Sequence, residues 1–414
     1  MGLGSIRSLL GLIVAAALLL TAPVSAPDVF AEPKDKKAAK PSAEKTAKSA
    51  KAASKAKIDE YLAAKAAYEK ALDAYWDDIA AKRRARMQKR RDKQEIALND
   101  YVLTQPPVYE GPSRPAGMPA PRREPKDVKL PPIPRAADFI RAASEHFQFV
   151  PQRPENELEF KRAYARVALA AGVTEDQAVR IYAFETGGNG AYDVQAGLTH
   201  PKKGSKPISP AVGYNQLLST NSIGLLAAKG DEFVKVLQER ARALEGDERS
   251  AMERKIEALK RMIAHSRSVP YAWAEHDKMA KFTPKGYALH AAIFDRDIGP
   301  LLQTQKLLDS VLFARRNGRS EPLTAAELEL MNFTGDGSGF DMVTMPREFR
   351  DKVPTANFFQ PRGYSRNPIA RRTGTVAALI ASIETKMDRA SQLPGAQEMA
   401  AAFREAAASK QASQ

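Results

Sequence analysis

The sequence predicts a mostly α-helical protein, and two observations carry this prediction. Beyond position 135, apolar residues recur at three- and four-residue steps, which places them on one face of a helix. No run of alternating apolar residues reaches strand length, although the Gly-rich loops leave room for a small strand pair. We therefore expect one mostly α globular domain over 136–392. Its expected helices are 136–148, 156–171, 175–186, 221–228, 231–265, 285–316, 324–331 and 372–391.

The N-terminus is typical of a secretory signal. Arg7 precedes an apolar run from Leu9 to Leu20, which is too short to span a bilayer comfortably. Cleavage after Ala31 fits the small-residue rule, whereas cleavage after Ala26 would leave a proline as the first residue. We expect a signal peptide over 1–31 and a location in the periplasm. An uncleaved anchor, which would leave the protein membrane-associated, is the alternative.

The segments between the signal and the globular domain differ in composition. Residues 32–57 have almost no large apolar side chains, so we expect disorder there. Residues 58–104 are expected to form one long basic helix, because its apolar residues again follow three- and four-residue steps. Two interpretations stay open: self-association as a coiled coil, or a helix lying on the globular domain or on a partner. The apolar residues are Ile58, Tyr61, Tyr68, Leu72, Tyr75 and Ile79.

Two further segments flank the globular domain. Residues 105–135 contain repeated prolines, which favour an extended, semi-rigid linker. Residues 393–414 are Ala-rich and polar, and we expect a tail that forms a frayed helix.

The net charge of +15 is concentrated near the N-terminus. Residues 32–135 hold 25 Lys and Arg against 15 Asp and Glu. Such a surplus favours an anionic polymer. Because the chain has a predicted export signal, we expect no nucleic acid as a partner. We expect the basic stretch 82–91 to bind anionic polymers of the envelope or a membrane surface. A solvated linker without a partner is the alternative.

Several chemistries are excluded or unsupported. Without cysteine, the chain has no disulfide, thiolate metal site or cysteine nucleophile. The histidines lack paired metal-ligand spacing, so we expect no metal and no cofactor. The run 335–339, Gly-Asp-Gly-Ser-Gly, lacks the lysine of a phosphate loop and predicts a turn. The five histidines are His146, His200, His265, His276 and His290.

Glu185 is the candidate for proton transfer. Thr174 and Gln177 have capping-box spacing at the start of its helix, and Gly187 and Gly188 end it. Three apolar residues share the face of Glu185, so its carboxyl group is expected to be buried. Burial and the negative helix end both raise the pKa of a carboxyl group. An ordinary solvent-facing residue of the last turn is the alternative. The three residues are Ala178, Ile181 and Tyr182.

Together with two later segments, this helix resembles the lytic transglycosylase and goose-type lysozyme superfamily. In that family a catalytic Glu ends a buried helix, and a Ser-x-x-Gly-x-x-Gln-Leu segment forms one wall of the sugar cleft. Glu185 matches the catalytic position. The residues taken as the wall positions are Ser209, Gly213, Gln216 and Leu217, within the run 209–223, and Ser209 lies one position further from Gly213 than in the pattern. The run 331–337 resembles the family's Tyr-Asn-x-Gly turn through Asn332 and Gly335, with one extra residue between them, and Tyr364 lies where a tyrosine often approaches the acid.

The resemblance implies a lysozyme-like, two-lobed helical domain that cleaves peptidoglycan. It implies that Glu185 is catalytic and that six residues contact the glycan strand: Ser209, Gly213, Tyr214, Gln216, Asn332 and Tyr364. The chain departs from the pattern at Thr186, Asn215 and Met331. Gln216 and Asn332 are 116 positions apart, which exceeds the family's usual spacing, so we expect a helical insertion over about 229–320.

The implied reaction needs one acid. Glu185 would protonate the oxygen between N-acetylmuramic acid and N-acetylglucosamine, and the substrate's acetamido group would stabilise the sugar cation. Canonical glycosidases use a second carboxylate, and Asp193, Asp336 and Asp341 lack compelling spacing for this role. The alternatives to an enzyme are an inactive glycan-binding module and an envelope assembly protein.

Overall fold

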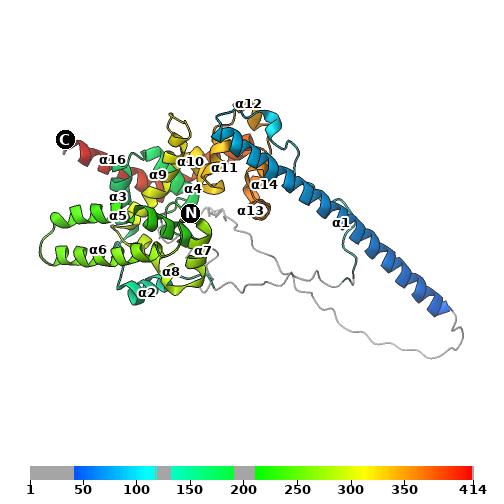
Figure 1. Ribbon diagram of the computed structural model, residues 1–414, viewed down its shortest axis with the longest axis horizontal. Coiled ribbons are helices and arrows are strands. Elements are labelled where there is room, and N and C mark those ends of the chain that lie inside the picture. Colours follow the sequence, from blue (N-terminus) through cyan, green and yellow to red (C-terminus); the bar gives the residue numbers. More distant parts are fainter. Residues whose placement is uncertain (1–41, 117, 119–131, 191–209, 413–414) are drawn as a thin grey trace, which may run out of the picture. The chain divides into compact units, whose positions relative to one another are not determined.

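The computed structural model describes residues 42–116, 118, 132–190 and 210–412 (Figure 1). The predicted signal peptide 1–31 and residues 32–41 lie outside this range. The chain divides into two units, 1–59 and 60–414. Throughout the described ranges the regular structure is helical and contains no strand, which confirms the predicted mostly α class. No helix within these ranges combines the length and apolar character needed to cross a membrane.

The helices follow one another closely in the chain. The first half comprises α1 (Ser42–Arg91), η1 (Leu98–Asp100), α2 (Ala136–Phe147), α3 (Glu157–Ala170), α4 (Glu175–Thr186), α5 (Ser219–Arg242), α6 (Gly246–Ser266), α7 (Trp273–Phe282), α8 (Pro284–Ala288) and η3 (Leu289–Phe294). The second half comprises α9 (Gly299–Arg316), α10 (Ala325–Thr334), α11 (Asp336–Val343), α12 (Arg347–Arg350), η4 (Thr355–Phe358), α13 (Pro361–Arg366), α14 (Pro368–Thr373), α15 (Val376–Ala390) and α16 (Pro394–Ala412).

Buried side chains of unit 60–414 form two clusters. One cluster gathers α3, α4, α10, α11, α15 and α16, and the other gathers α2, α5, α6, α7 and η3. Helix α9 belongs to both, because Leu302 lies in the second cluster and Leu307 in the first. Helix α9 also packs against α3 and α10. The range 229–320, expected as an insertion, therefore ends in a helix that joins the two clusters.

The two longest predicted helices of the domain are interrupted in the structure. The range 231–265 turns back at 243–245, so α5 and α6 pack as a hairpin. Gly246 has the left-handed φ of 53°, a backbone conformation that favours glycine at this reversal. The range 285–316 breaks before Pro300, which has no N–H to donate. At this break the Asp295 carboxylate accepts the backbone N–H groups of Asp297 and Ile298, at 2.9 and 3.2 Å.

Helix α1 starts at Ser42, within the segment expected to be disordered. In unit 60–414, Ile79 is 1% exposed and the Tyr75 hydroxyl donates to the Thr104 carbonyl at 3.0 Å. Tyr109 of the Pro-rich segment packs edge-on against Tyr61 and Tyr68. From Tyr75 onward this helix therefore lies on its own domain, as one of the two interpretations expected, and self-association stays a prediction.

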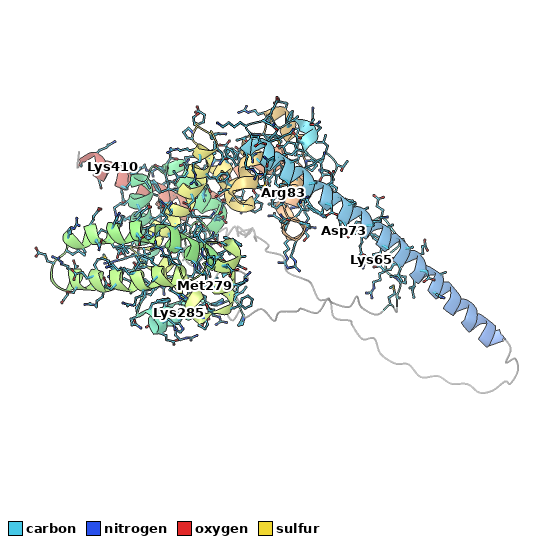
Figure 2. All side chains as sticks on the ribbon, viewed as in Figure 1. Lys65, Asp73, Arg83, Met279, Lys285 and Lys410 are labelled. Atoms are coloured by element: carbon cyan, nitrogen blue, oxygen red, sulfur yellow. The ribbon has the colours of Figure 1, made fainter. Side chains whose placement is uncertain are left out.

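The basic stretch 82–91 is largely occupied by contacts within unit 60–414. Arg83, near the C-terminal end of α1 (Figure 2), donates to the carbonyl groups of Asn357 and Phe359. Arg86 is 1% exposed and donates to Asp341 at 2.8 Å. Lys82, Lys89 and Arg90 also bind carbonyl or carboxylate oxygens of the same unit. Most of the basic side chains that were expected to bind an anionic polymer therefore bind oxygen atoms of their own unit instead.

The C-terminal helix is packed and not frayed. Along α16, Ala396, Met399 and Phe403 are buried against α3 and α4. The buried ammonium group of Lys161 on α3 binds Glu398 of α16 at 2.9 Å. The Ala-rich, polar composition of 393–414 had predicted a frayed helix. Here their small side chains let α16 approach its neighbours closely.

Candidate active site

Glu185 lies where the capping residues of α4 place it. Thr174 Oγ1 accepts the N–H of Gln177, and the Gln177 side chain accepts the N–H of Thr174. Gly187 ends the helix with φ 83°. Ala178, Ile181 and Tyr182 are buried, as expected from their spacing. The last turn of α4 therefore directs Glu185 toward neighbouring helices and leaves the residue partly accessible to solvent.

Asn332 is the sequence-predicted residue that contacts Glu185. Its Nδ2 donates a hydrogen bond to Glu185 Oε1 at 2.7 Å. Asn332 lies on α10, in a segment expected to be a turn; the helix continues to Thr334, and Gly335 follows it. The structure therefore brings together two residues 147 positions apart that the family resemblance had singled out separately.

A second carboxyl group, that of Glu329, also contacts Glu185. Glu329 is 1% exposed, and its carboxyl group lies near enough to that of Glu185 for the two groups to shift each other's pKa. Among the described residues, no N–H or hydroxyl group donates to either Glu329 oxygen. The sequence analysis missed this residue. Its signal was a glutamate in an apolar run, three positions before Asn332 and so on the same helix face.

Burial raises the pKa of both carboxyl groups. Protein atoms crowd the Glu185 carboxyl group, and this desolvation raises its pKa above the ordinary value. The neighbouring Glu329 carboxyl group and the charge of Lys386 oppose the rise. For Glu329, burial comes first and the adjacent charge of Glu185 adds to it, so its pKa lies well above the usual range. Of the two carboxyl groups, Glu329 is therefore the one that holds a proton more strongly.

Two lysines supply positive charge to the carboxyl pair. Lys386 on α15 and Lys306 on α9 both act on Glu185 and Glu329 through their charges. The Lys386 ammonium lies 3.7 Å from the ring centroid of Phe184, which precedes Glu185 on α4. Two of the three aspartates considered as a second carboxylate have other partners: Asp336 accepts from Ser310, and Asp341 binds Arg86 and Arg90. Asp193 lies outside the described residues.

The predicted cleft-wall segment forms a short closed loop. Val212 and Leu217 exchange both backbone hydrogen bonds at 2.9 Å, the isolated bridge that replaces the strand pair. Inside the loop, Gly213 has φ 86°, and any Cβ there would collide with the Gln303 amide. Gln303 is buried, and its Oε1 accepts the Asn215 N–H at 3.1 Å. Helix α9 therefore holds the loop from behind.

Two residues of this loop have different surroundings. Gln216 is partly exposed, and its Nε2 donates to the Gly213 carbonyl at 2.9 Å. Tyr214 is fully buried, which differs from its expected place on the glycan. Its ring packs edge-on against Phe160, Tyr164 and Tyr182, and its hydroxyl donates to Glu157 at 2.8 Å. Tyr214 therefore anchors the loop in the core.

A buried serine–histidine pair supports the start of the loop. Ser222 and His290 are both fully buried, with Ser222 Oγ 2.7 Å from His290 Nδ1. His290 Nε2 lies 3.1 Å from the Pro210 carbonyl. Burial lowers the pKa of His290 to about 4, so the ring is neutral and donates through one nitrogen only. Because a carbonyl can only accept, Nε2 donates to Pro210 and Nδ1 accepts from Ser222.

Of the two remaining predicted site residues, Ser209 lies outside the described residues, and the ring contacts of Tyr364 are with residues other than Glu185. Tyr364 is buried, packs against Trp76 and Phe359, and lines a separate cleft of about 1240 Å³ beside α1. In the described ranges, no three His, Asp or Glu side chains gather as metal ligands would.

Comparison of the chain with known protein families, with curated proteins and with solved structures finds no match. The arrangement around Glu185 therefore has to be interpreted from its own chemistry. It offers a partly accessible glutamate whose carboxyl group has a raised pKa, a fixed amide donor and a buried carboxyl group as a neighbour. A carboxyl group with a raised pKa can both give and take a proton.

Proposed function

We propose that the chain is a peptidoglycan lytic transglycosylase in which Glu185 is the single catalytic acid and base. The hydrogen bond from Asn332 to Glu185 carries the proposal. It joins two segments, each of which resembles a different motif of one enzyme superfamily. A chance resemblance of either segment would not require them to meet.

The proposed reaction has two proton transfers. Glu185 first protonates the oxygen that links N-acetylmuramic acid to N-acetylglucosamine, and the bond from C1 to this oxygen breaks. The substrate's acetamido oxygen bonds to C1 and carries the positive charge. Glu185 then takes the proton of the C6 hydroxyl group, whose oxygen displaces the acetamido oxygen from C1. The product is an anhydro-muramoyl end, formed without water.

The surrounding residues receive roles that fit their contacts. Asn332 fixes one oxygen of Glu185 and leaves the other for proton transfer. Gly213 and Gln216 form the wall of the cleft, and Gln303 keeps this wall in place. Tyr214 supports the wall from the core, and we assign no substrate contact to Tyr364. The two clusters of buried side chains correspond in this proposal to the two lobes of a lysozyme-like domain.

The proposal includes a setting for this activity. The substrate is the glycan strand of peptidoglycan, which implies export to the periplasm through the segment 1–31. No cofactor takes part. Exposed members of the basic stretch, such as Arg84, remain available to anionic polymers of the envelope.

The decisive experiment measures soluble muropeptides released from purified sacculi by residues 32–414. We expect Glu185→Gln to lower the release by about a hundredfold or more, because the amide cannot donate a proton to the bridge oxygen. Glu248→Gln, which removes one exposed carboxylate of α6, is the charge-matched control and should act like the parent.

The mass of the products separates the alternatives. Anhydro ends that disappear in Glu185→Gln support the transglycosylase, whereas hydrated ends indicate a lysozyme-type hydrolase. Equal, negligible release by parent and variant contradicts the enzyme. Retained binding to sacculi would then favour a glycan-binding module.

A further inference from the structure

The Glu185–Glu329 contact places two acids where one proton must be shared. Helix α10 begins at a capping box of Thr324 and Glu327, and its buried residues Leu328, Leu330 and Met331 fix it against α4. This packing sets both Glu329 and Asn332 facing Glu185, one helical turn apart. The Glu185 carboxyl group therefore has an amide on one side and a buried acid on the other.

The proton content of this pair follows from its partners. Two ionised carboxylates in contact, one of them fully buried, repel each other strongly. No described N–H or hydroxyl group donates to Glu329 to relieve this repulsion. Because nothing else neutralises the buried Glu329 group, the pair keeps one proton, and a carboxylic acid beside a carboxylate is the stable state.

We propose that Glu329 is a positioning residue that stores one proton and passes it to Glu185 when the substrate's bridge oxygen arrives. This inference rests on the proposed function and adds a source for the proton that Glu185 donates. Glu329 is too deeply buried to touch the sugar, so it acts only through Glu185.

The proton balance closes over one turnover. In the resting pair Glu329 is protonated and Glu185 is ionised. The proton moves from Glu329 to Glu185 and then to the bridge oxygen, as the C1–O bond breaks and the acetamido oxygen bonds to C1. The C6 hydroxyl proton next goes to Glu185 and returns to Glu329, while the C6 oxygen bonds to C1 and the bond from C1 to the acetamido oxygen breaks.

The doubly ionised pair exists only between the two transfers. At that stage the acetamido group bonded to C1 carries a positive charge close to the pair. Lys386 and Lys306 are the other charged groups that act on the pair, and Asn332 remains hydrogen bonded to Glu185. These positive charges limit the repulsion while the proton is away.

The first test reads proton sharing without using activity. Carboxyl carbons of glutamate are labelled with ¹³C in the full chain, and the Glu185 and Glu329 signals are assigned by their loss in Glu185→Gln and Glu329→Gln. We expect both signals to move in the same titration step. Removing the neighbouring charge in Glu185→Gln should lower the Glu329 midpoint by about one pH unit or more.

Two independent single-step titrations, with the Glu329 midpoint unchanged in Glu185→Gln, would overturn the proposal. Glu248→Gln must leave both signals in place. Because this test needs no turnover, it stands even if the parent releases no muropeptides. Failure of the proposed function and failure of the shared proton are thereby distinguished.

The second test is the pH profile of muropeptide release. The parent should lose activity only where the pair loses its last proton. In Glu329→Gln the store is absent, so the alkaline limb should move down by about one pH unit or more. Glu329→Asp, which keeps a carboxyl group, should restore part of the shift. A uniform loss at every pH, with the limb unmoved, would indicate a merely structural role.

Discussion

Two features favour glycine at position 213: the left-handed backbone and the lack of room for a side chain. Gly172 shares only the first of these features. Gly172 has almost the same left-handed φ, 87° against 86°, but has no heavy atom within 4 Å of a built Cβ. At Gly213 the Cβ would strike the buried Gln303 amide. The backbone conformation is therefore common to both glycines, and the collision belongs to Gly213 alone.

The first residue-scale prediction compares the two alanine variants. Gly172→Ala should cost about 1 kcal/mol of unfolding free energy, the ordinary cost of a left-handed alanine. Gly213→Ala should cost about 3 kcal/mol or more, because Gln303 must also move. Urea denaturation measures both. Equal losses would show that Gln303 yields without resistance.

The sequence predicted part of the candidate site, and the residues show why it stopped there. Glu185 and Asn332 could be found because each belongs to a local motif of recognisable spacing. Glu329 could not be found in this way, since only the packing of α10 on α4 brings it to Glu185. Tyr214 was misplaced for a related reason: alternate residues of a tight loop face opposite sides, and sequence spacing does not say which side is the core.

At the scale of elements, signals at helix ends were more reliable than signals within helices. Helix α4 begins after Thr174 and ends before Gly187, as predicted, because both capping residues act through the adjacent backbone. The predictions based on periodicity alone gave one helix across the chain reversal at 243–245, and they missed α7 and α11. The packing of α1 on its own domain depends on partners more than 250 residues away, such as Asp341.

The attachment of α1 depends on one buried carboxylate. Asp341 accepts Arg86 Nε at 2.8 Å, Arg90 Nη2 at 2.7 Å and the Tyr101 hydroxyl at 3.1 Å. Arg86 and Asp341 are both almost inaccessible to solvent. Removing the carboxylate would leave a buried guanidinium group without its counter-charge.

We therefore predict that Asp341→Asn lowers the unfolding free energy by about 3 kcal/mol. Asp351→Asn, an exposed aspartate of the same region, should change it by less than about 0.5 kcal/mol. Chemical denaturation followed by tryptophan fluorescence suits the measurement, because Trp76 lies on α1. A loss of similar size in both variants would contradict the assigned role of Asp341.

At the scale of the whole molecule, both ends of unit 60–414 pack against other helices of the unit. Near its start, the C-terminal part of α1 is tied to residues 341–359. Near its end, α16 covers α3 and α4. The side chain of Lys161 on α3 is inaccessible to solvent and binds Glu398 of α16.

Truncation tests this arrangement. A chain ending at Leu393 should lose its cooperative unfolding transition or melt about 10 °C or more below the parent, because it exposes the Phe403 site and leaves Lys161 unpaired. A chain ending at Ser409 loses the exposed residues 410–412 together with 413–414, and it should melt with the parent. Similar melting temperatures for all three chains would mean that α16 is dispensable.

The position of α16 has a consequence for the timing of assembly. Helix α4, which presents Glu185, is made early in synthesis, yet its packing partners α10, α15 and α16 follow between 139 and 226 residues later. While segment 394–412 is still inside the ribosome, one side of α4 has no cover. Products of interrupted synthesis would therefore carry the sequence of the site without its geometry.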